Sequence, residues 1–255
     1  MHSDASDAGP LAIVLAAGKG TRMKSELPKV LVPVAGRPMI RYVIDALTGA
    51  GVARILVVVG YRSDLVRAEL SDDPHVEFVE QHEQLGTGHA VMMCRDQLAL
   101  HRGPVLIVAG DSPLLQTSSV RTLLENFSAS RCDCVIGTVD KTDPGGYGRI
   151  LRNRGGQFIG IVEEKDATPA QRAICEVNVS TYVFGSQQLL FALDQLTDEN
   201  AQKEYYITDC PAVLLAADKQ VRADKVLHPC ESMSINNMDE LALVEAEIKR
   251  KASTN

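Results

Sequence analysis

The sequence predicts an α/β protein with a doubly wound, mostly parallel sheet, and two patterns lead to this expectation. Short apolar runs of the kind that buried parallel strands use recur along the first part of the chain. They lie at residues 11–15, 55–59, 76–79, 105–108 and 134–139. The segments between them carry helical patterns, as the crossovers of a doubly wound sheet require.

The first expected helix follows Pro38, which suits a first helical turn because the N–H that proline lacks would have no partner there. Apolar side chains then recur at helical spacing, at Met39, Ile40, Val43, Ile44 and Leu47. We expect the later crossovers to be helices over 89–98 and 117–127.

The second half of the chain predicts a different arrangement. Residues 148–162 read as two strands around the turn Asn153-Arg154-Gly155-Gly156, and 177–184 as another strand. Helices are expected over 187–196, 211–218 and 239–250. We assign the segment from about 147 to 184 to a small β subregion beside the main sheet.

Composition narrows the class of protein. The chain has 255 residues, 45% of them apolar, which is enough to bury a full core as a single domain over 11–251. Its formal net charge of −7 argues against a nucleic-acid partner. No apolar run approaches the ~18 residues of a membrane helix, so we expect no membrane partner. Residues 1–10 are polar, which predicts a disordered lead-in rather than a signal peptide, and a cytoplasmic protein.

The six cysteines do not predict a metal site. Cys132 and Cys134 are separated by one residue, fewer than a zinc ribbon uses, and no second pair follows. The others are scattered singly among apolar neighbours. We therefore expect buried, reduced thiols.

A glycine loop follows the first expected strand directly. Its sequence is Leu-Ala-Ala-Gly-Lys-Gly-Thr-Arg-Met over 15–23, and Pro28-Lys29 comes shortly after. Glycine lets backbone N–H groups approach phosphate oxygens closely, and the cations supply the charge that a polyanion needs. The spacing differs from a P-loop and from the dinucleotide fingerprint, so we predict a nucleoside triphosphate site of another kind.

Several further motifs share an order along the chain with this loop. They are Gln81-His82-Glu83-Gln84-Leu85-Gly86-Thr87-Gly88-His89-Ala90, Gly110-Asp111-Ser112-Pro113-Leu114, Gly146-Tyr147-Gly148-Arg149-Ile150, Ile161-Val162-Glu163-Glu164-Lys165-Asp166-Ala167, Glu176-Val177-Asn178, the stretch 200–209 and Ile235-Asn236-Asn237. In this order, from about 11 to 247, the chain resembles the sugar-nucleotide pyrophosphorylases. Among these it is similar to the uridylyltransferase domain of the bifunctional N-acetylglucosamine-1-phosphate uridylyltransferase/glucosamine-1-phosphate acetyltransferases.

The resemblance implies a Rossmann-like nucleotidyltransferase fold and a reaction. The substrates would be UTP and N-acetylglucosamine 1-phosphate, and the products UDP-N-acetylglucosamine and pyrophosphate, formed with Mg²⁺ by in-line attack at the α-phosphorus. It also implies that the nucleotide part covers about 11–146 and 205–251, and the sugar-binding part about 147–204.

The resemblance assigns two catalytic cations and a set of nucleotide contacts. Arg22 would neutralise the leaving pyrophosphate, and Lys29 would bridge to the α-phosphate or the sugar phosphate. The nucleotide contacts would come from Leu15, Ala16, Ala17, Gly18, Gly20, Thr21, Gln81, Gly86, Thr87, Gly110 and Asp111.

Metal and sugar residues are implied in the same way. Asp111 would hold Mg²⁺ together with Asn236, although an acid at a strand end can also cap a helix. Gly148, Glu163 and Asn178 would contact the sugar.

The chain departs from the family pattern at three places. Ala109 replaces a common tyrosine, Val179-Ser180 replaces Thr-Gly, and Ser234-Ile235 replaces Gly-Val. None of these changes removes a charge that the transfer needs, but they leave open another hexose 1-phosphate as substrate. The other alternative is a protein that binds UDP-sugar without turnover, and the retention of Arg22, Lys29, Asp111 and Asn236 argues against it. The β-helix repeats of the acetyltransferase half are not in the sequence, so we expect no acetyl transfer, no trimer, and a monomer or weak oligomer.

Overall fold

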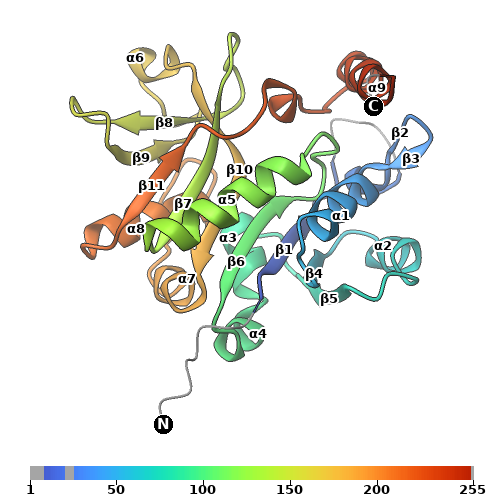
Figure 1. Cartoon of the computed structure of the whole chain (residues 1–255), viewed down its shortest axis with the longest axis horizontal. Coiled ribbons are helices and arrows are strands. Elements are labelled where there is room, and N and C mark those ends of the chain that lie inside the picture. Colours follow the sequence, from blue (N-terminus) through green and yellow to red (C-terminus); the bar gives the residue numbers. More distant parts are fainter. Residues whose placement is uncertain (1–8, 21–25, 254–255) are drawn as a thin grey trace.

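The structure is a computed structural model, and it describes residues 9–20 and 26–253 of the chain. Within these ranges nine strands form the central sheet, in the order β11-β7-β10-β6-β1-β4-β5, with β8 and β9 attached through β10 (Figure 1). Their bounds are β1 (Leu11–Ala16), β4 (Arg54–Val59), β5 (Val76–Glu80), β6 (Pro104–Ala109), β7 (Cys134–Asp140), β8 (Gly148–Arg152), β9 (Phe158–Val162), β10 (Glu176–Gly185) and β11 (Val221–Asp224).

The predicted sheet is confirmed, and it is mostly parallel. β1 pairs in parallel with β4 and β6, β4 with β5, and β7 with β11. The apolar runs of β1, β4 and β6 are continuous because both faces of these three strands are covered: Ile13, Val57 and Ile107 are fully buried. Since the parallel strands share one direction, their carboxyl ends meet at one edge, where open α/β sheets place ligands.

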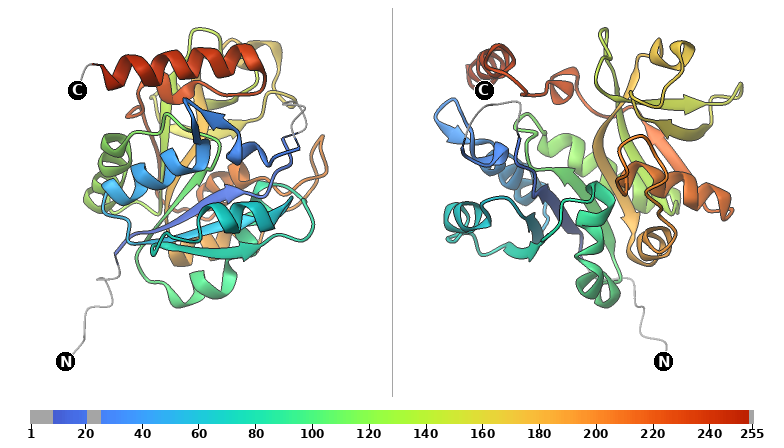
Figure 2. Two further views of the ribbon diagram at one scale, coloured as in Figure 1. Left: turned by 90° about the vertical axis from the view of Figure 1, so that its right-hand side faces the viewer. Right: turned by 180° about the vertical axis from the view of Figure 1, so that it is seen from behind.

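Helices cover both faces, as a doubly wound sheet requires (Figure 2). One face packs against α1 (Met39–Gly49), α2 (Ser63–Glu69) and α5 (Thr117–Ser130). The other face packs against α3 (Thr87–Met92), α4 (Arg95–Leu100), α7 (Ser186–Leu193) and α8 (Cys210–Ala216). The helical spacing read in α1 is confirmed, because Met39, Ile40, Val43, Ile44 and Leu47 are all buried.

The helix expected over 89–98 is wrong as a single element. The chain forms α3 and α4 instead, with a tight turn between them. Met93 N–H donates to the carbonyl of Ala90 and Cys94 N–H to that of Val91, so the spacing of the α-helical bonds is interrupted before α4 begins.

The strand β10 also differs from expectation. It was assigned to a subregion beside the main sheet, yet it lies inside the sheet and runs antiparallel to both β6 and β7. Its first residues also pair with β8, and β8 and β9 form the expected hairpin. β10 is therefore shared: its amino half lies between β7 and β8 of the hairpin, and its carboxyl half lies between β7 and β6.

Several short elements were not predicted, because they are too brief to show a period. They are β2 (Pro33–Val34), β3 (Arg37–Pro38), α6 (Pro169–Arg172), η2 (Lys29–Leu31), η3 (Ile207–Asp209) and η4 (Pro229–Ser232), together with α2 and β11. The expected C-terminal helix is present as α9 (Met238–Ala252). It packs Leu241 and Val244 against Val34 and Met39, and so joins the end of the chain to β2 and α1.

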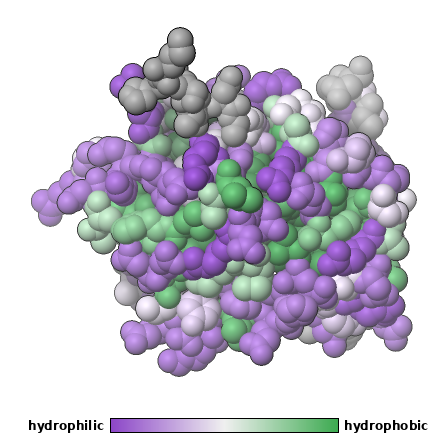
Figure 3. Space-filling model, turned by 90° about the horizontal axis from the view of Figure 1, so that it is seen from below, coloured by the Kyte–Doolittle hydropathy of each residue, from purple (hydrophilic) through white to green (hydrophobic). Residues whose placement is uncertain are grey.

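The edge at which the parallel strands begin carries α4 and α7. Seen from below (Figure 3), hydrophobic residues form a band bordered by hydrophilic ones. Leu100 of α4 is 84% exposed and Phe191 of α7 is 41% exposed. This edge lies opposite the carboxyl ends of the strands.

No helix in the described ranges has the length and apolar character needed to cross a membrane.

The six cysteines are free, as predicted, but they are not all buried. Cys94, Cys134 and Cys210 are buried, Cys132 and Cys230 are partly buried, and Cys175 is exposed. Burial raises the pKa of the Cys94 thiol to about 12, so this thiol is held in its neutral form.

Candidate active site at the carboxyl edge of the sheet

Two cavities open side by side at the carboxyl edge of the sheet. The loop cavity, of about 290 Å³, lies between the glycine loop and the start of α3. The hairpin cavity, of about 340 Å³, lies among β8, β9, β10 and η4. Ala109, Asp111 and Ser180 line both of them. A ligand with one part in each cavity would therefore pass these three side chains.

The loop cavity brings together most of the residues predicted to contact a nucleotide. Those that line it are Leu15, Ala16, Ala17, Gly18, Gly20, Lys29, Gln81, Gly86, Thr87 and Asp111. Thr21 and Arg22 lie outside the described residues. Gly110 does not line the cavity.

Gly110 has a packing role in the structure. Its N–H donates to the carbonyl of Leu15 at 2.9 Å, which ties the end of β6 to the end of β1. A Cβ at this position would lie 3.0 Å from that carbonyl oxygen. Glycine is favoured here because the two strand ends meet closely.

Gly20, in the described part of the glycine loop, lies directly on Lys29. Gly20 has φ +66°, and a Cβ there would lie 2.6 Å from the Cβ of Lys29. The positive φ and the close approach both call for glycine. The loop is also tied to the end of β4, because Tyr61 N–H donates to the carbonyl of Ala17 at 3.1 Å.

Lys29 contacts both of the predicted metal ligands. Its Nζ lies 2.6 Å from Oδ2 of Asp111 and 3.4 Å from Oδ1 of Asn236. Asn236 is 207 positions away along the chain, and η2 and the segment before α9 bring the two together. The cluster is partly buried, since the Lys29 side chain is 17% exposed and that of Asp111 is 30% exposed.

Neighbouring groups orient Asn236. Its Nδ2 donates to Oγ of Ser234 and to Oε2 of Glu240, both at 3.0 Å, which leaves Oδ1 directed at Lys29. One carboxylate and one amide oxygen thus face the same cation position. Oxygen donors of this kind suit Mg²⁺, which keeps several waters and takes its remaining ligands from phosphates. The donor set fits that metal. No group of three or more His, Cys, Asp or Glu side chains arranged for a metal occurs in the described ranges.

The side chain of Gln81 is held by residues that follow it closely in the sequence. Its Nε2 donates to the carbonyl of Gly86 at 3.2 Å and lies 3.0 Å from Nδ1 of His89. With the amide nitrogen engaged, its Oε1 remains available as an acceptor, and the residue lines the cavity. Thr87 Oγ1 accepts from the N–H of Ile207 at 3.1 Å, so this residue fastens α3 to η3 as well as lining the cavity.

The three predicted sugar contacts converge in the hairpin cavity. Gly148, Glu163 and Asn178 all line it. A Cβ at Gly148 would lie 3.4 Å from Oε1 of Glu163 and 3.6 Å from the Cβ of Asn178. Burial raises the pKa of the Glu163 carboxyl, and the negative charges of Asp209 and Asp166 add to the effect.

The hairpin cavity also contains residues that sequence reasoning missed. Tyr147 donates from its hydroxyl to the carbonyl of Ser232 at 2.7 Å. Glu231 is 7% exposed and accepts from Ser119 Oγ at 2.6 Å and from Gln116 N–H at 3.0 Å, which fixes η4 to the start of α5. Tyr147 lies within a quoted motif, whereas nothing in the local sequence distinguishes Glu231.

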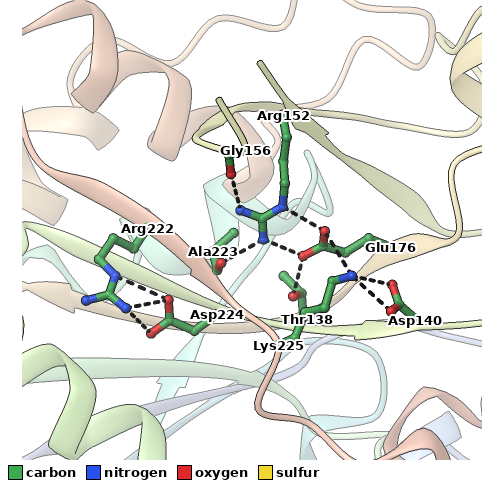
Figure 4. Close-up of polar contacts among 9 residues, drawn as sticks. All are labelled: Thr138, Asp140, Arg152, Gly156, Glu176, Arg222, Ala223, Asp224 and Lys225. Carbon is green, nitrogen blue, oxygen red and sulfur yellow. Dashed lines mark hydrogen bonds and ion pairs between the residues drawn. The ribbon is translucent and has the colours of Figure 1, made fainter. Parts of the chain in front are cut away.

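A polar network anchors the hairpin to the sheet (Figure 4). Glu176 of β10 accepts from Arg152 of β8 through both carboxylate oxygens, at 2.6 and 2.8 Å, and from Thr138 of β7 at 2.7 Å. Lys225 lies 3.7 Å from the same carboxylate and contacts Asp140. Because Glu176 is two residues before Asn178, the network fixes the strand that carries this cavity residue.

Known proteins resemble the chain over almost its whole length. It is 44% identical over 240 residues to the bifunctional protein GlmU of Streptococcus mutans, covering 94% of this chain and 52% of that relative. It is 45% identical over 238 residues to the bifunctional protein GlmU of Heliobacterium modesticaldum, covering 93% and 52%. The chain thus spans about half the length of the curated relatives that it matches.

A solved structure supports the fold. The crystal structure of UDP-glucose pyrophosphorylase complexed with UDP-glucose superposes with a TM-score of 0.75, covering 95% of this chain and 99% of that one, at 16% sequence identity. Residues 12–220 match the family described as the MobA-like NTP transferase domain. The chain therefore belongs to the MobA-like NTP transferase domain family.

Proposed function

We propose that the chain transfers a uridylyl group from UTP to N-acetylglucosamine 1-phosphate, giving UDP-N-acetylglucosamine and pyrophosphate. The single observation that carries the proposal is the junction of the two cavities at Asp111, beside Lys29. The loop cavity takes the nucleotide and the hairpin cavity takes the sugar. The two reacting phosphates then meet at a cationic side chain.

For this reaction the protein has to position the two phosphates and offset their negative charge. An oxygen of the sugar phosphate forms a bond to the α-phosphorus of UTP, and the bond from that phosphorus to the β-phosphate oxygen breaks, so that pyrophosphate leaves. Backbone groups of Gly18 and Gly20 face the phosphates, and Lys29 offsets negative charge at the α-phosphate. Arg22 is expected to act on the pyrophosphate.

Asp111 and Asn236 are the residues that would hold Mg²⁺, because their oxygens face one cation position. Bound there, Mg²⁺ would neutralise phosphate charge as the transition state forms. The ammonium of Lys29 contacts both of these oxygens, at 2.6 and 3.4 Å, and so lies beside the position that the metal would take.

The uracil base of UTP and the sugar of the sugar 1-phosphate have different partners. In the loop cavity, Oε1 of Gln81 accepts from the uracil N3–H, and the small loop residues pack on the nucleoside. In the hairpin cavity, Glu163 accepts from sugar hydroxyls and Asn178 lies at the 2-substituent. Gly148 leaves space for the sugar ring, because a side chain there would fill the gap between Glu163 and Asn178.

The test is pyrophosphate release with Mg²⁺ and UTP against a panel of hexose 1-phosphates, with CTP, dTTP and ATP as controls. The proposal expects release with UTP and N-acetylglucosamine 1-phosphate. Turnover of a different hexose 1-phosphate alone would leave the proposed reaction class intact and would show that N-acetylglucosamine 1-phosphate is the wrong substrate. No turnover with any pair, while UDP-N-acetylglucosamine still binds, would replace the enzyme with a binding protein.

A further inference from the structure

The backbone of Ser180 adopts a conformation that serine rarely takes. Its φ is +57°, in the left-handed region, which is strained for a residue with a Cβ. Other non-glycine residues with positive φ in the described ranges, such as Ala35, do not line either cavity of the site. Strain of this kind persists only where the surroundings impose it, and it gathers at functional positions.

A bulge in β10 imposes the conformation. Asn178 pairs with Thr138 of β7, and Tyr182 pairs with Ile136. Between these two pairs β10 advances by four residues and β7 by two, so β10 contains two extra residues. Ser180 lies in the middle of the extra residues, and its N–H donates to Oδ1 of Asn178 at 3.2 Å. Bulges redirect side chains, and this one places Ser180 at the wall between the cavities.

The position of Ser180 is chemically specific. It shares the junction with Asp111, which is ion-paired to Lys29, and with Ala109, whose methyl group offers no hydrogen bond. The hydroxyl of Ser180 is thus a neutral donor among charged groups at the point where both cavities open.

Hydrogen bonds link Ser180 to the buried side chain of Tyr182 and to Asn178. Burial raises the pKa of the Tyr182 phenol, while hydrogen bonds with Asn178 and Ser180 act in the opposite direction. Asn178 Nδ2 donates to the phenolic oxygen at 2.7 Å. Tyr182 is fully buried whereas Ser180 lines both cavities, so the phenol approaches the serine from inside the protein.

We propose that Ser180 contacts the substrate through its hydroxyl, which donates a hydrogen bond to a non-bridging oxygen of the phosphates that join nucleotide and sugar. The proposal rests on the proposed function and adds a residue to it. The bond forms to the sugar 1-phosphate and α-phosphate as they meet, and to the diphosphate of the product. Donors placed at such an oxygen stabilise the charge that develops in the transition state.

Two substitutions separate the hydroxyl from the backbone. Ser180→Ala removes the hydroxyl and keeps the left-handed strain, whereas Ser180→Gly removes both. We expect each variant to lower kcat/KM by about tenfold, the equivalent of one hydrogen bond. Ser180→Gly should also melt at a higher temperature than Ser180→Ala, because it relieves the strain.

The control is Ala35→Gly, which relieves a left-handed residue, φ +50°, away from both cavities. It should raise the melting temperature and leave kcat/KM unchanged. Binding of UDP-N-acetylglucosamine, measured by calorimetry, gives a readout besides turnover, and both Ser180 variants should bind it about fivefold more weakly.

The outcomes distinguish this proposal from the function on which it rests. Variants within twofold of an active wild type in both rate and product affinity would overturn the role of Ser180 and leave the proposed function intact. A wild type without turnover would overturn the proposed function, and the calorimetric comparison would still decide whether Ser180 contacts a UDP-sugar.

Discussion

The Nζ of Lys29 lies 2.6 Å from Oδ2 of Asp111, so the cation named for catalysis and the carboxylate named for the metal form one ion pair. Oδ1 of Asn236 completes the group at 3.4 Å from the same nitrogen. The pair is partly exposed, and pairs of this kind contribute little to folding. Its value lies in placing a positive and a negative group where the two cavities meet.

Replacing Lys29 should cost activity far more than stability. We expect Lys29→Ala to lower kcat/KM by an amount equivalent to about 2–4 kcal/mol of transition-state stabilisation, as for the loss of one preorganised donor. The matched control is Lys19→Ala, because Lys19 is exposed on the same loop and its Nζ lies over the Tyr61 ring. Steady-state kinetics decide the matter: a loss below tenfold in Lys29→Ala would make this lysine peripheral.

Asp111→Asn keeps the shape of the side chain and removes its charge. We expect turnover to be lost and the melting temperature to stay close to that of the wild type, because the side chain is 30% exposed and outside the core. Thermal melts with UTP, with and without Mg²⁺, give a second readout. The wild type should gain stability from Mg²⁺ and the variant should not; an unchanged rate and an unchanged metal effect in the variant would remove Asp111 from the metal site.

The glycine loop can be tested with two alanine substitutions at positive φ. Gly20→Ala adds backbone strain and a Cβ 2.6 Å from the Cβ of Lys29, whereas Gly36→Ala, φ +80°, adds strain with nothing within 4 Å. Both should lose about 1 kcal/mol of unfolding free energy. Only Gly20→Ala should also lower kcat, by displacing Lys29. Equal kinetics in the two variants would show that the loop does not position the lysine.

The sequence predicted the sheet well because the strands β1, β4, β6 and β7 are buried on both faces and appear as largely apolar runs. The edge strand β5 is shorter and alternates with exposed glutamates. The resemblance to the pyrophosphorylases, carried by short motifs, named most of the residues that line the loop cavity. Each strand and each motif is a local pattern, which a sequence displays directly.

Features set by distant parts of the chain could not be predicted in this way. Nothing in β10 shows that it enters the sheet between β6 and β7, because strand pairing is decided by segments far along the chain. Glu231 meets Ser119 across 112 positions, and the left-handed backbone of Ser180 depends on a bulge against β7. These contacts form only when the whole sheet is assembled.

The carboxyl of Glu176 should link stability to pH. Burial alone would raise its pKa, but hydrogen bonds from Arg152 and Thr138 outweigh burial, and the pKa is lowered from 4.5. A lowered pKa means that the folded state releases this proton more readily than the unfolded state. The resulting stability is fully present above the unfolded value, near 4.5, and is lost as the pH falls through the folded value.

Glu176→Gln isolates this contribution. It should lower the unfolding free energy at pH 7 by roughly 1–3 kcal/mol, because Arg152 loses a charged partner that is 8% exposed. Denaturant unfolding from pH 7 to pH 3 measures the difference between wild type and variant. That difference should shrink below pH 4.5, where the wild-type carboxyl also becomes neutral. A constant difference across the range would assign the loss to packing rather than to charge.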